Sequence, residues 1–214
     1  MKISMMINYS RDFHADVQKV CDLENAGLDL VWVPEAYSFD AVSQLGYLAA
    51  KTSKIEIGTG IINVYSRTAT CVAQTAAGLD FVSGGRFILG LGASGPQVIE
   101  GFHGVPYEKP MARIRDYINV CRMTWKREPV VYEGPTVQVP LPEGQGTGLG
   151  KPLKIINHPV RNDIPIFWAS LMGLSVTATA QYADGWLPIF FDPEKFHQVW
   201  GDELKAGTAK RDAD

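Results

Sequence analysis

Short apolar runs alternate with amphipathic stretches along most of the chain, and each pair has the length of a strand followed by a helix. The clearest example lies between residues 54 and 96. Residues 55–62 form a mostly apolar run, residues 68–83 carry apolar side chains at helical spacing up to Gly84-Gly85, and residues 86–92 form a second apolar run. Near-continuous apolar strands joined by a crossover helix are typical of a parallel sheet covered on its faces.

The same unit repeats along the rest of the chain, with one interruption. Residues 129–163 break the rhythm, because residues 130–140 alternate like an edge hairpin and residues 143–152 read as a flexible loop. The sequence therefore predicts a single domain over residues 1–214 with an insertion at about 129–163. The other predicted strands are residues 2–8, 28–34, 164–170 and 186–191; the other predicted helices are residues 15–26, 41–51 with Asp40 as N-cap, 111–126, 175–182, and a last helix opened by Asp192-Pro193-Glu194.

About six strand–helix units can be placed in this way, and two architectures accommodate them. The closed form of the pattern is the (β/α)₈ TIM barrel, which usually needs about 250 residues. This α/β chain has 214 residues, part of which belongs to the insertion, and nothing after Phe191 reads as a strand. The alternatives are an open six-stranded sheet and a barrel that is C-terminally incomplete. The barrel-like rhythm favours the incomplete barrel, with the last two βα units missing.

Gly90-x-Gly92-x-x-Gly95 follows a predicted strand directly and matches a dinucleotide-binding fingerprint. That interpretation needs a helix packed on the strand and an acid at the end of the next strand. Here Pro96 follows at once, the chain is predicted to be irregular as far as Pro110, and the nearest acid at that distance falls inside a helical pattern. We therefore interpret the glycines as a strand-end loop whose amides can approach an anion or a flat ring closely.

Composition excludes several classes of function. The net charge is −3 and no basic run is present, so no nucleic acid is expected as a partner. Residues 164–183 are uncharged and long enough for a membrane span, but their proline, glycine and hydroxyl residues favour strand, turn and helix, so we expect no membrane association and a cytoplasmic protein. No metal-ligand spacing links the histidines to cysteine or acid residues. The cysteines, Cys21, Cys71 and Cys121, fall on predicted helices and are expected to be buried reduced thiols.

Two segments carry a resemblance to a known family: SGGRFILGLGASGPQVIEGFHG at residues 83–104, which is highly specific, and YADGWLP at residues 182–188, which is a weaker mark. With the segments around residues 30–68 and 192–207, they resemble the bacterial-luciferase-like (LLM) superfamily, and within it the branch that uses coenzyme F420, an 8-hydroxy-5-deazaflavin. Members of this superfamily are complete (β/α)₈ barrels. The resemblance therefore implies a luciferase-like TIM barrel of which about two units are missing here.

The resemblance also implies a cofactor site at the ends of three strands. Gly60-Ile61 matches a bulge in which family members carry a non-proline cis peptide behind the deazaflavin ring; an ordinary strand-end bulge is the alternative. The loop after residue 170 precedes a helix N-terminus, which favours the phosphodiester arm of the cofactor, although many relatives have Gly-Pro where this chain has Met172-Gly173. The cofactor-binding residues implied in this way are Gly60, Ile61, Ile62, Asn63, Ala93, Ser94, Gly95, Ser170, Leu171, Met172 and Gly173.

A catalytic residue and a substrate pocket are predicted near these loops. Glu35 resembles the acidic position near the reactive carbon of the cofactor in this family; alternatively, it caps the following turn or pairs with Arg67. Aromatic residues at predicted strand ends could wall an apolar pocket for a small-molecule substrate. They are Tyr9, Tyr37, Phe39, Tyr65, Trp168 and Phe190.

Three functions remain open at this point. The resemblance favours an F420-dependent oxidoreductase that transfers a hydride between the cofactor and a small organic substrate, of the CH-OH or CH-CH type. The alternatives are an FMN-dependent monooxygenase of the same superfamily and a non-catalytic incomplete barrel. A homodimer is expected, whereas the substrate and the direction of hydride transfer cannot be read from the sequence.

Overall fold

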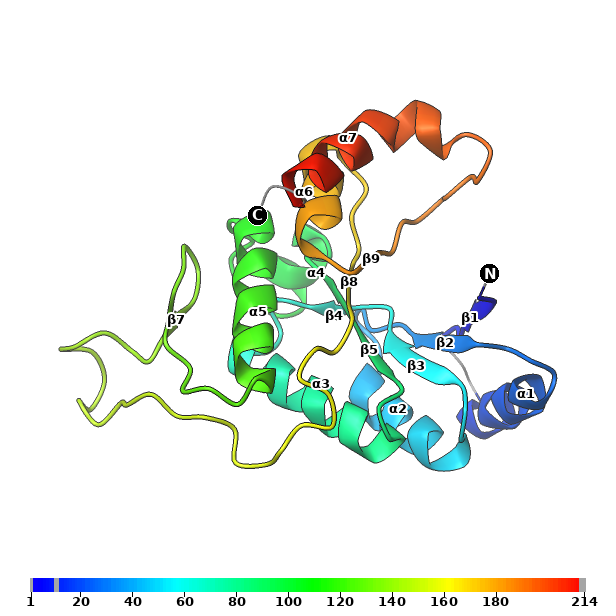
Figure 1. Ribbon diagram of the computed structural model, residues 1–214, viewed down its shortest axis with the longest axis horizontal. Coiled ribbons are helices and arrows are strands. Elements are labelled where there is room, and N and C mark those ends of the chain that lie inside the picture. Colours follow the sequence, from blue (N-terminus) through cyan, green and yellow to red (C-terminus); the bar gives the residue numbers. More distant parts are fainter. Residues whose placement is uncertain (1, 10–11, 212–214) are drawn as a thin grey trace.

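The computed structural model describes residues 2–9 and 12–211, and a curled parallel sheet lies at its centre (Figure 1). The strand order is β1-β2-β3-β5-β8-β9, and β4 pairs with β5 beside β3. This arrangement confirms the α/β fold with the topology of an incomplete barrel. The strands are β1 Ser4–Met6, β2 Leu30–Val33, β3 Glu56–Thr59, β4 Ile62–Asn63, β5 Phe87–Gly92, β8 Ile166–Trp168 and β9 Gly185–Trp186.

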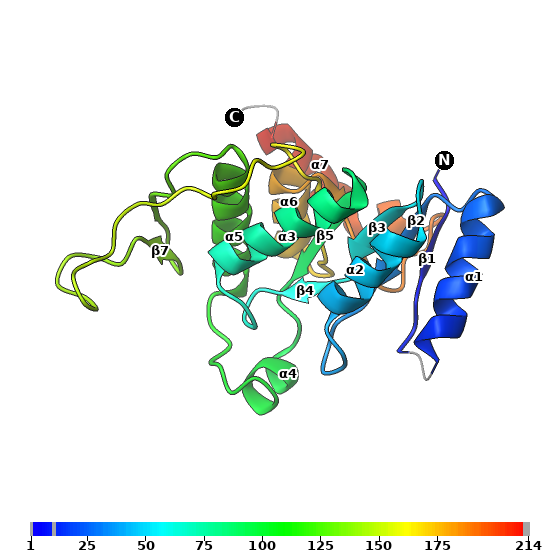
Figure 2. The same ribbon diagram turned by 90° about the horizontal axis from the view of Figure 1, so that it is seen from below.

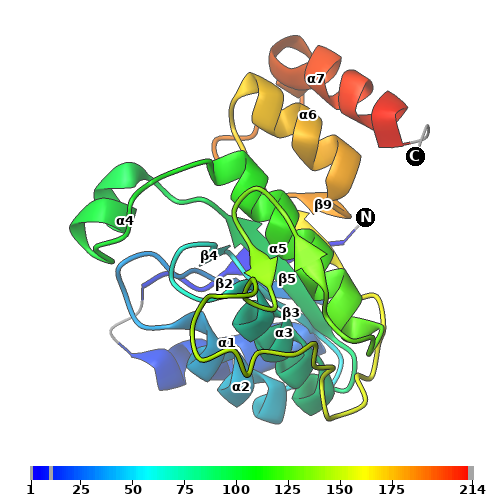
Figure 3. The ribbon, with the colours of Figure 1, turned by 90° about the vertical axis from the view of Figure 1, so that its left-hand side faces the viewer.

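The helices other than α4 form an outer layer, in which α1 contacts α2, α2 contacts α3, α3 contacts α5, α5 contacts α6 and α6 contacts α7 (Figure 2). The pair α6 and α7 packs together and stands apart from the helices that cover β1 to β5 (Figure 3). The short helix α4 projects beyond the strand ends, next to the loop after β5. The helices are α1 Phe13–Asn25, α2 Ala41–Lys51, α3 Ala69–Ser83, α4 Pro96–Gly101, α5 Pro110–Trp125, α6 Gly173–Tyr182 and α7 Phe196–Arg211.

Capping residues fix the helix starts and ends that the sequence predicted. Asp40 Oδ1 accepts a hydrogen bond from the amide of Ser43 at 2.8 Å, which defines the start of α2. Thr68 Oγ1 accepts one from the amide of Cys71 at the start of α3. Helix α3 ends at Gly84, which adopts the left-handed conformation with φ of 68°.

Strand β2 is buried on both faces and divides the interior into two clusters. Val31 and Val33 belong to the main core between the sheet and the helices. Leu30 and Trp32 point to the other face, where they pack with Ile88. A strand buried on both sides reads as a continuous apolar run, which explains why no alternation is visible in this part of the sequence.

The insertion forms a separate two-stranded antiparallel sheet, β6 Tyr132–Glu133 and β7 Gln138–Val139, so the predicted hairpin is confirmed but does not join the edge of the main sheet. Asp116 on α5 fixes this hairpin: its carboxylate accepts hydrogen bonds from Tyr132 Oη, from the amide and hydroxyl of Thr136 and from the amide of Val137. At the other end of the insertion, Arg161 forms an ion pair with the buried Asp80 of α3.

Four predictions about local structure are corrected. Residues 96–101 are helical rather than irregular, because proline suits the first turn of a helix, where its missing amide proton is not needed. The last strand stops at Trp186 instead of Phe191, because only Gly185 and Trp186 have pairing partners on β8. The last helix begins at Phe196, after a turn over residues 193–195. Cys71 is exposed on the outer side of α3, whereas Cys121 is buried and Cys21 is partly buried; all three are free thiols.

The uncharged stretch at residues 164–183 forms strand β8, a loop and helix α6, as the sequence predicted. Within the described part of the chain, no helix combines the length and apolar character needed to cross a bilayer.

Candidate functional site

A cavity of about 470 Å³, here called the strand-end cavity, lies where the carboxyl ends of the central strands meet. The loops after β2, β5 and β8 line it, together with the Gly60-Ile61 segment between β3 and β4 and the first residues of α5. Parallel α/β proteins place their ligand sites at this end of the sheet. The predicted site residues that line the cavity are Glu35, Gly60, Ile61, Ala93, Ser94, Ser170, Leu171 and Met172.

The remaining predicted residues lie beside the cavity without lining it. Ile62 is fully buried in the main core. The Asn63 side chain is also buried, and its Oδ1 accepts hydrogen bonds from the amides of Tyr65 at 3.0 Å and Ser66 at 2.9 Å. Gly95 is the N-cap of α4, and Gly173 is the first residue of α6. Asn63 thus holds the turn that follows β4.

The predicted bulge lies between β3 and β4. The Gly60–Ile61 peptide bond is cis, which confirms that prediction. Gly58 pairs with Ile88 and Ile62 pairs with Leu91, so three residues on one strand face two on the other, and one residue is extra. The extra residue bends the strand and brings Gly60 and Ile61 to the cavity wall.

Thr59 and Gly90 bridge the gap that the bulge leaves in the ladder. The Thr59 hydroxyl donates to Gly90 O at 2.9 Å and accepts from Gly90 N at 2.8 Å. A Cβ atom at residue 90 would lie 1.8 Å from the carbonyl oxygen of Thr59, so only glycine fits. The first glycine of the Gly90-x-Gly92 motif therefore serves close strand contact rather than phosphate binding.

The second glycine of that motif shapes the cavity wall. A Cβ atom at Gly92 would lie 2.9 Å from Cδ1 of Ile61, so this glycine leaves room for the Ile61 side chain. The following loop is held in place by Tyr107, whose hydroxyl donates to the carbonyl oxygen of Ser94 at 3.2 Å. Burial raises the pKa of Tyr107, so the hydroxyl keeps the proton that it donates. Tyr107 also stacks on Tyr65, with ring centroids 5.3 Å apart.

The loop between β8 and α6 offers amide groups at the opposite side of the cavity. Two indole groups fix its course: Trp186 Nε1 donates to Ser170 O at 2.9 Å, and Trp200 Nε1 donates to Leu171 O at 3.0 Å. The first amides of a helix have no acceptor within the helix and lie at the positive end of its dipole. Helix α6 begins at Gly173, and the amides of Met172 and Ser175 already donate within this turn, to Ser175 Oγ and to Met172 O. The amides of Gly173 and Leu174 are therefore the ones placed to bind an anionic group.

Glu35 lies at the cavity wall, but hydrogen bonds already occupy both of its carboxylate oxygens. Arg67 forms a two-point ion pair with it, and the amide of Ala41 donates to Oε2 at 2.8 Å. The hydrogen bond to Glu35 raises the pKa of Arg67, despite the opposing effect of burial. The pairing with Arg67, one of the two alternatives suggested for Glu35, is thus present. Instead of capping only the following turn, Glu35 also accepts a hydrogen bond from the first amide of α2.

The predicted aromatic residues do not form one wall. Tyr9 and Trp168 line the strand-end cavity, whereas Tyr37 and Phe39 line a neighbouring cavity. Tyr65 is buried, and its hydroxyl donates to Glu108 O at 2.9 Å. Phe190 is 93% exposed and lines neither cavity, because the chain leaves the sheet after Trp186. The prediction of a pocket wall is therefore wrong for Tyr65 and Phe190.

Sequence reasoning missed the part of the wall that comes from the loop before α5 and from its first turns. Tyr107, Pro110, Met111 and Ile114 line the cavity although they follow the nearest predicted site residue by more than ten positions. No local motif marks them, because they reach the cavity only when α5 packs beside α3. Within residues 2–9 and 12–211, no group of three or more histidine, cysteine or acidic side chains is placed to hold a metal ion.

Comparison with known proteins places this architecture among described families. The sequence profile of the luciferase-like monooxygenase family matches residues 1–214. A Mycobacterium tuberculosis protein, provisionally assigned as a coenzyme F420-dependent oxidoreductase, is 42% identical over 210 residues, which cover 95% of this chain and 60% of that protein. The 5,10-methylenetetrahydromethanopterin reductase of Archaeoglobus fulgidus is 30% identical over 189 residues, covering 87% of this chain and 52% of the reductase.

Solved structures agree on the fold. The F420-dependent tetrahydromethanopterin reductase of Methanopyrus kandleri superimposes with a TM-score of 0.83 at 23% identity, covering 99% of this chain and 62% of that one. An F420-dependent secondary alcohol dehydrogenase superimposes with a TM-score of 0.81 at 20% identity, covering 100% of this chain and 66% of the dehydrogenase. The chain thus spans about half to two thirds of the length of these proteins.

Proposed function

Because the chain belongs to the luciferase-like monooxygenase family, we propose that it is an oxidoreductase that uses coenzyme F420 to exchange a hydride with a small organic substrate. The observation that carries this proposal is the strand-end cavity, in which a bulged strand, a glycine-rich loop and a helix N-terminus face the same space. The relative at 42% identity, to which an F420-dependent activity is provisionally assigned, supports the same cofactor.

The residues present fit a flat ring that carries an anionic arm. Gly60, Ile61, Ala93 and Ser94 form a wall of mostly small side chains, against which a planar ring can lie closely. The amides at the start of α6, next to Met172, would hold the anionic arm. When bound, a 5-deazaflavin supplies two-electron hydride chemistry, and the protein supplies position and electrostatics.

The chain's own residues would act on this chemistry in two ways. Ile61, Leu171 and Ile189 line the cavity with apolar surface, which would displace water from the reacting atoms when ligands fill it. Glu35 presents its carboxyl group at the wall, held in place by Arg67 and by the amide of Ala41. We propose that the Glu35–Arg67 pair sets the charge beside the reacting centre, with Glu35 as the acidic residue of the site.

An FMN-dependent monooxygenase is the second candidate, because the family description names a monooxygenase and one solved structure of this fold contains FMN. That structure, the oxygenating constituent of 3,6-diketocamphane monooxygenase from Pseudomonas putida, has a TM-score of 0.77 at 18% identity. A non-catalytic role is the third candidate. Binding of the two cofactors, measured in parallel, separates all three.

The test is a titration of the purified protein with F420 and with FMN, followed by absorbance and fluorescence. We expect tighter binding of F420 and slow reoxidation of its bound, reduced form in air. Gly92→Ala should weaken binding about tenfold, because the new methyl group displaces Ile61 at the wall. Gly78→Ala on the exposed side of α3 is the matched control. Tighter binding of FMN with rapid reoxidation would favour the monooxygenase, and binding of neither would favour the non-catalytic role.

A further inference from the structure

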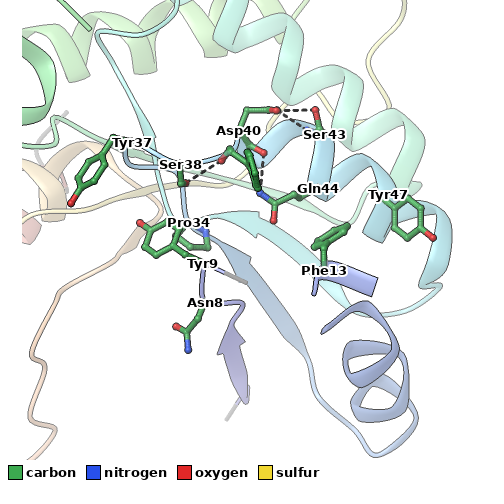
Figure 4. Close-up of a pocket in the computed structure, with 11 residues that line it drawn as sticks. Asn8, Tyr9, Phe13, Pro34, Tyr37, Ser38, Asp40, Ser43, Gln44 and Tyr47 are labelled. Carbon is green, nitrogen blue, oxygen red and sulfur yellow. Dashed lines mark hydrogen bonds between the residues drawn. The ribbon is translucent and has the colours of Figure 1, made fainter. Parts of the chain in front are cut away.

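A second cavity of about 880 Å³, here called the aromatic cavity, lies at the ends of β1 and β2 and against α1 and α2 (Figure 4). Its aromatic lining distinguishes it from the strand-end cavity. Figure 4 shows Tyr9 next to Pro34 on one side of the space and Phe13 near Tyr47 on the other. The aromatic residues that line it are Tyr9, Phe13, Tyr37, Phe39 and Tyr47.

Charge is nearly absent from this lining. Among the described lining residues, Asp40 alone carries a formal charge, and both of its oxygens are engaged: Oδ1 accepts from the amide of Ser43 at 2.8 Å and Oδ2 from its hydroxyl at 2.9 Å. Burial raises the pKa of Asp40, but the hydrogen bonds from Ser43 and the nearby Arg67 outweigh it, and the pKa lies below its usual range. Among the lining residues that the structure describes, none is a cation that could pair with an anionic ligand.

Three of the five aromatic rings that line the cavity are largely exposed to solvent. Phe39 is 82% exposed, Tyr37 is 68% exposed and Tyr9 is 61% exposed. Large apolar side chains gathered in one hollow mark a binding site more often than isolated exposed ones do. Phe13 and Tyr47 are already arranged edge to face, with ring centroids 5.8 Å apart, and offer the same geometry to a further ring.

Tyr9 connects the two cavities, because it lines both of them. We propose that the aromatic cavity is a substrate subsite for a neutral, largely apolar molecule with a ring system, whose reacting end passes Tyr9 into the strand-end cavity. This inference rests on the proposed oxidoreductase function. Asn8, Ser38 and Gln44 supply the few polar contacts that orient such a molecule.

A pair of probes of similar size tests the preference for neutral ligands. The neutral ketone 2-acetonaphthone and the anion 2-naphthoate are titrated into the full chain without cofactor, with isothermal calorimetry as the readout. We expect 2-acetonaphthone to bind at least about tenfold more tightly, because no cation among the described lining residues compensates for the desolvation of the carboxylate. Equal binding of both probes, or no binding of the ketone, overturns the proposal.

A matched pair of variants locates the bound ketone. Phe39→Ser should weaken its binding about tenfold, and this side chain is exposed enough for the fold to tolerate the change. Phe81→Ser removes an aromatic ring that is 68% exposed on α3, far along the chain and outside the aromatic cavity, and should leave binding within about twofold. Equal losses in both variants would show that the ketone binds nonspecifically and would overturn the proposal.

Repeating the titration with F420 present separates this inference from the proposed function. We expect ketone and cofactor to bind together, and Phe39→Ser to leave cofactor affinity unchanged. Displacement of one by the other would place the ketone in the strand-end cavity and overturn the subsite. Ketone binding without any F420 binding would reject the proposed function and leave an aromatic-ligand site, whereas F420 binding without ketone binding would reject the subsite alone.

Discussion

Arg67 and Glu35 form a two-point ion pair, with Nη1 2.5 Å from Oε1 and Nη2 3.0 Å from Oε2. The Glu35 side chain is 7% exposed and that of Arg67 is 19% exposed, so the pair is largely shielded from solvent. It joins the loop after β2 to the loop after β4 at the rim of the strand-end cavity. A shielded, bidentate pair of this kind fixes the positions of the two loops relative to each other.

Glu35→Gln should lower the free energy of unfolding by about 2–3 kcal/mol, because the amide cannot form the same pair and leaves Arg67 without its partner. Turnover should fall as well, with cofactor affinity nearly unchanged, as expected for a residue that acts mainly in the transition state. Denaturant unfolding and steady-state kinetics, both measured on the folded variant, report the two effects separately.

Arg67→Gln is the matched control for that experiment, since it breaks the same pair and keeps the carboxylate. A larger loss of turnover in Glu35→Gln than in Arg67→Gln would assign the effect to the carboxylate itself. Equal losses would mean that Glu35 serves only to hold Arg67. Full turnover in Glu35→Gln would show that its role is structural.

Gly90→Ala should destabilise the fold by more than about 3 kcal/mol, because its Cβ atom would lie 1.8 Å from the Thr59 carbonyl oxygen. Relief of this clash would require the paired backbones of β3 and β5 to move apart. Gly78→Ala meets no atom within 4 Å on the exposed side of α3 and should stabilise the helix by up to about 1 kcal/mol. Thermal unfolding of both variants measures the contrast. Similar melting temperatures would contradict the close approach of β3 and β5.

Tyr107→Phe should weaken cofactor binding about three- to tenfold, because it removes the hydrogen bond that holds the carbonyl of Ser94 at the cavity wall. Tyr132→Phe is the control: it removes a hydroxyl that donates to Asp116 at 2.9 Å and lies outside the strand-end cavity. Cofactor affinity is measured by fluorescence titration. A comparable loss of affinity in Tyr132→Phe would point to general loosening rather than to the loop at Ser94.

Glu24 supports the start of β3 and gives the stability a pH dependence. Its Oε1 accepts hydrogen bonds from the amides of Ser53, Lys54 and Ile55. Burial raises the pKa of Glu24, but these three hydrogen bonds and the nearby Arg86 outweigh it, so the pKa lies below its usual range. A lowered pKa in the folded state stabilises the protein above the unfolded-state pKa of about 4.3 and loses that contribution as the pH falls further.

Glu24→Gln should therefore lower the free energy of unfolding by about 1–2 kcal/mol at pH 7. The difference in this free energy between variant and parent protein should shrink as the pH falls below about 4. Urea unfolding across this pH range is the measurement. Glu143→Gln, in the exposed loop of the insertion, should show no difference at any pH. A penalty for Glu24→Gln that does not change with pH would contradict the role of the charge.

The strand–helix alternation and the caps of α2 and α3 could be predicted from the sequence, because each depends on residues close together in the chain. The bulge at Gly60-Ile61 was implied by the family resemblance alone. The sequence does not predict helix α4, because Pro96 and the glycines that follow favour irregular structure, although proline is also favourable in a first turn. The end of β9 depends on how far β8 continues beside it, and no local pattern carries that information.

The candidate site was predictable only in part, for the same reason. The glycine-rich loop after β5 and the start of α6 are marked by local composition, and the resemblance pointed to both. Tyr107 reaches Ser94 through the path of a long loop, and Glu35 finds Arg67 across 32 positions of sequence. Such contacts follow from the packed fold rather than from a motif.

Polar contacts anchor both ends of the insertion to the helices: Asp116 of α5 binds the hairpin, and Asp80 of α3 pairs with Arg161 near β8. Between these anchors, residues 143–150 are exposed, and Gly144, Gly146 and Gly148 adopt positive φ. None of these residues lines either cavity. This loop is therefore a natural place to graft a biotin-acceptor peptide, so that the protein can be immobilised on a sensor surface while both cavities stay open to ligands.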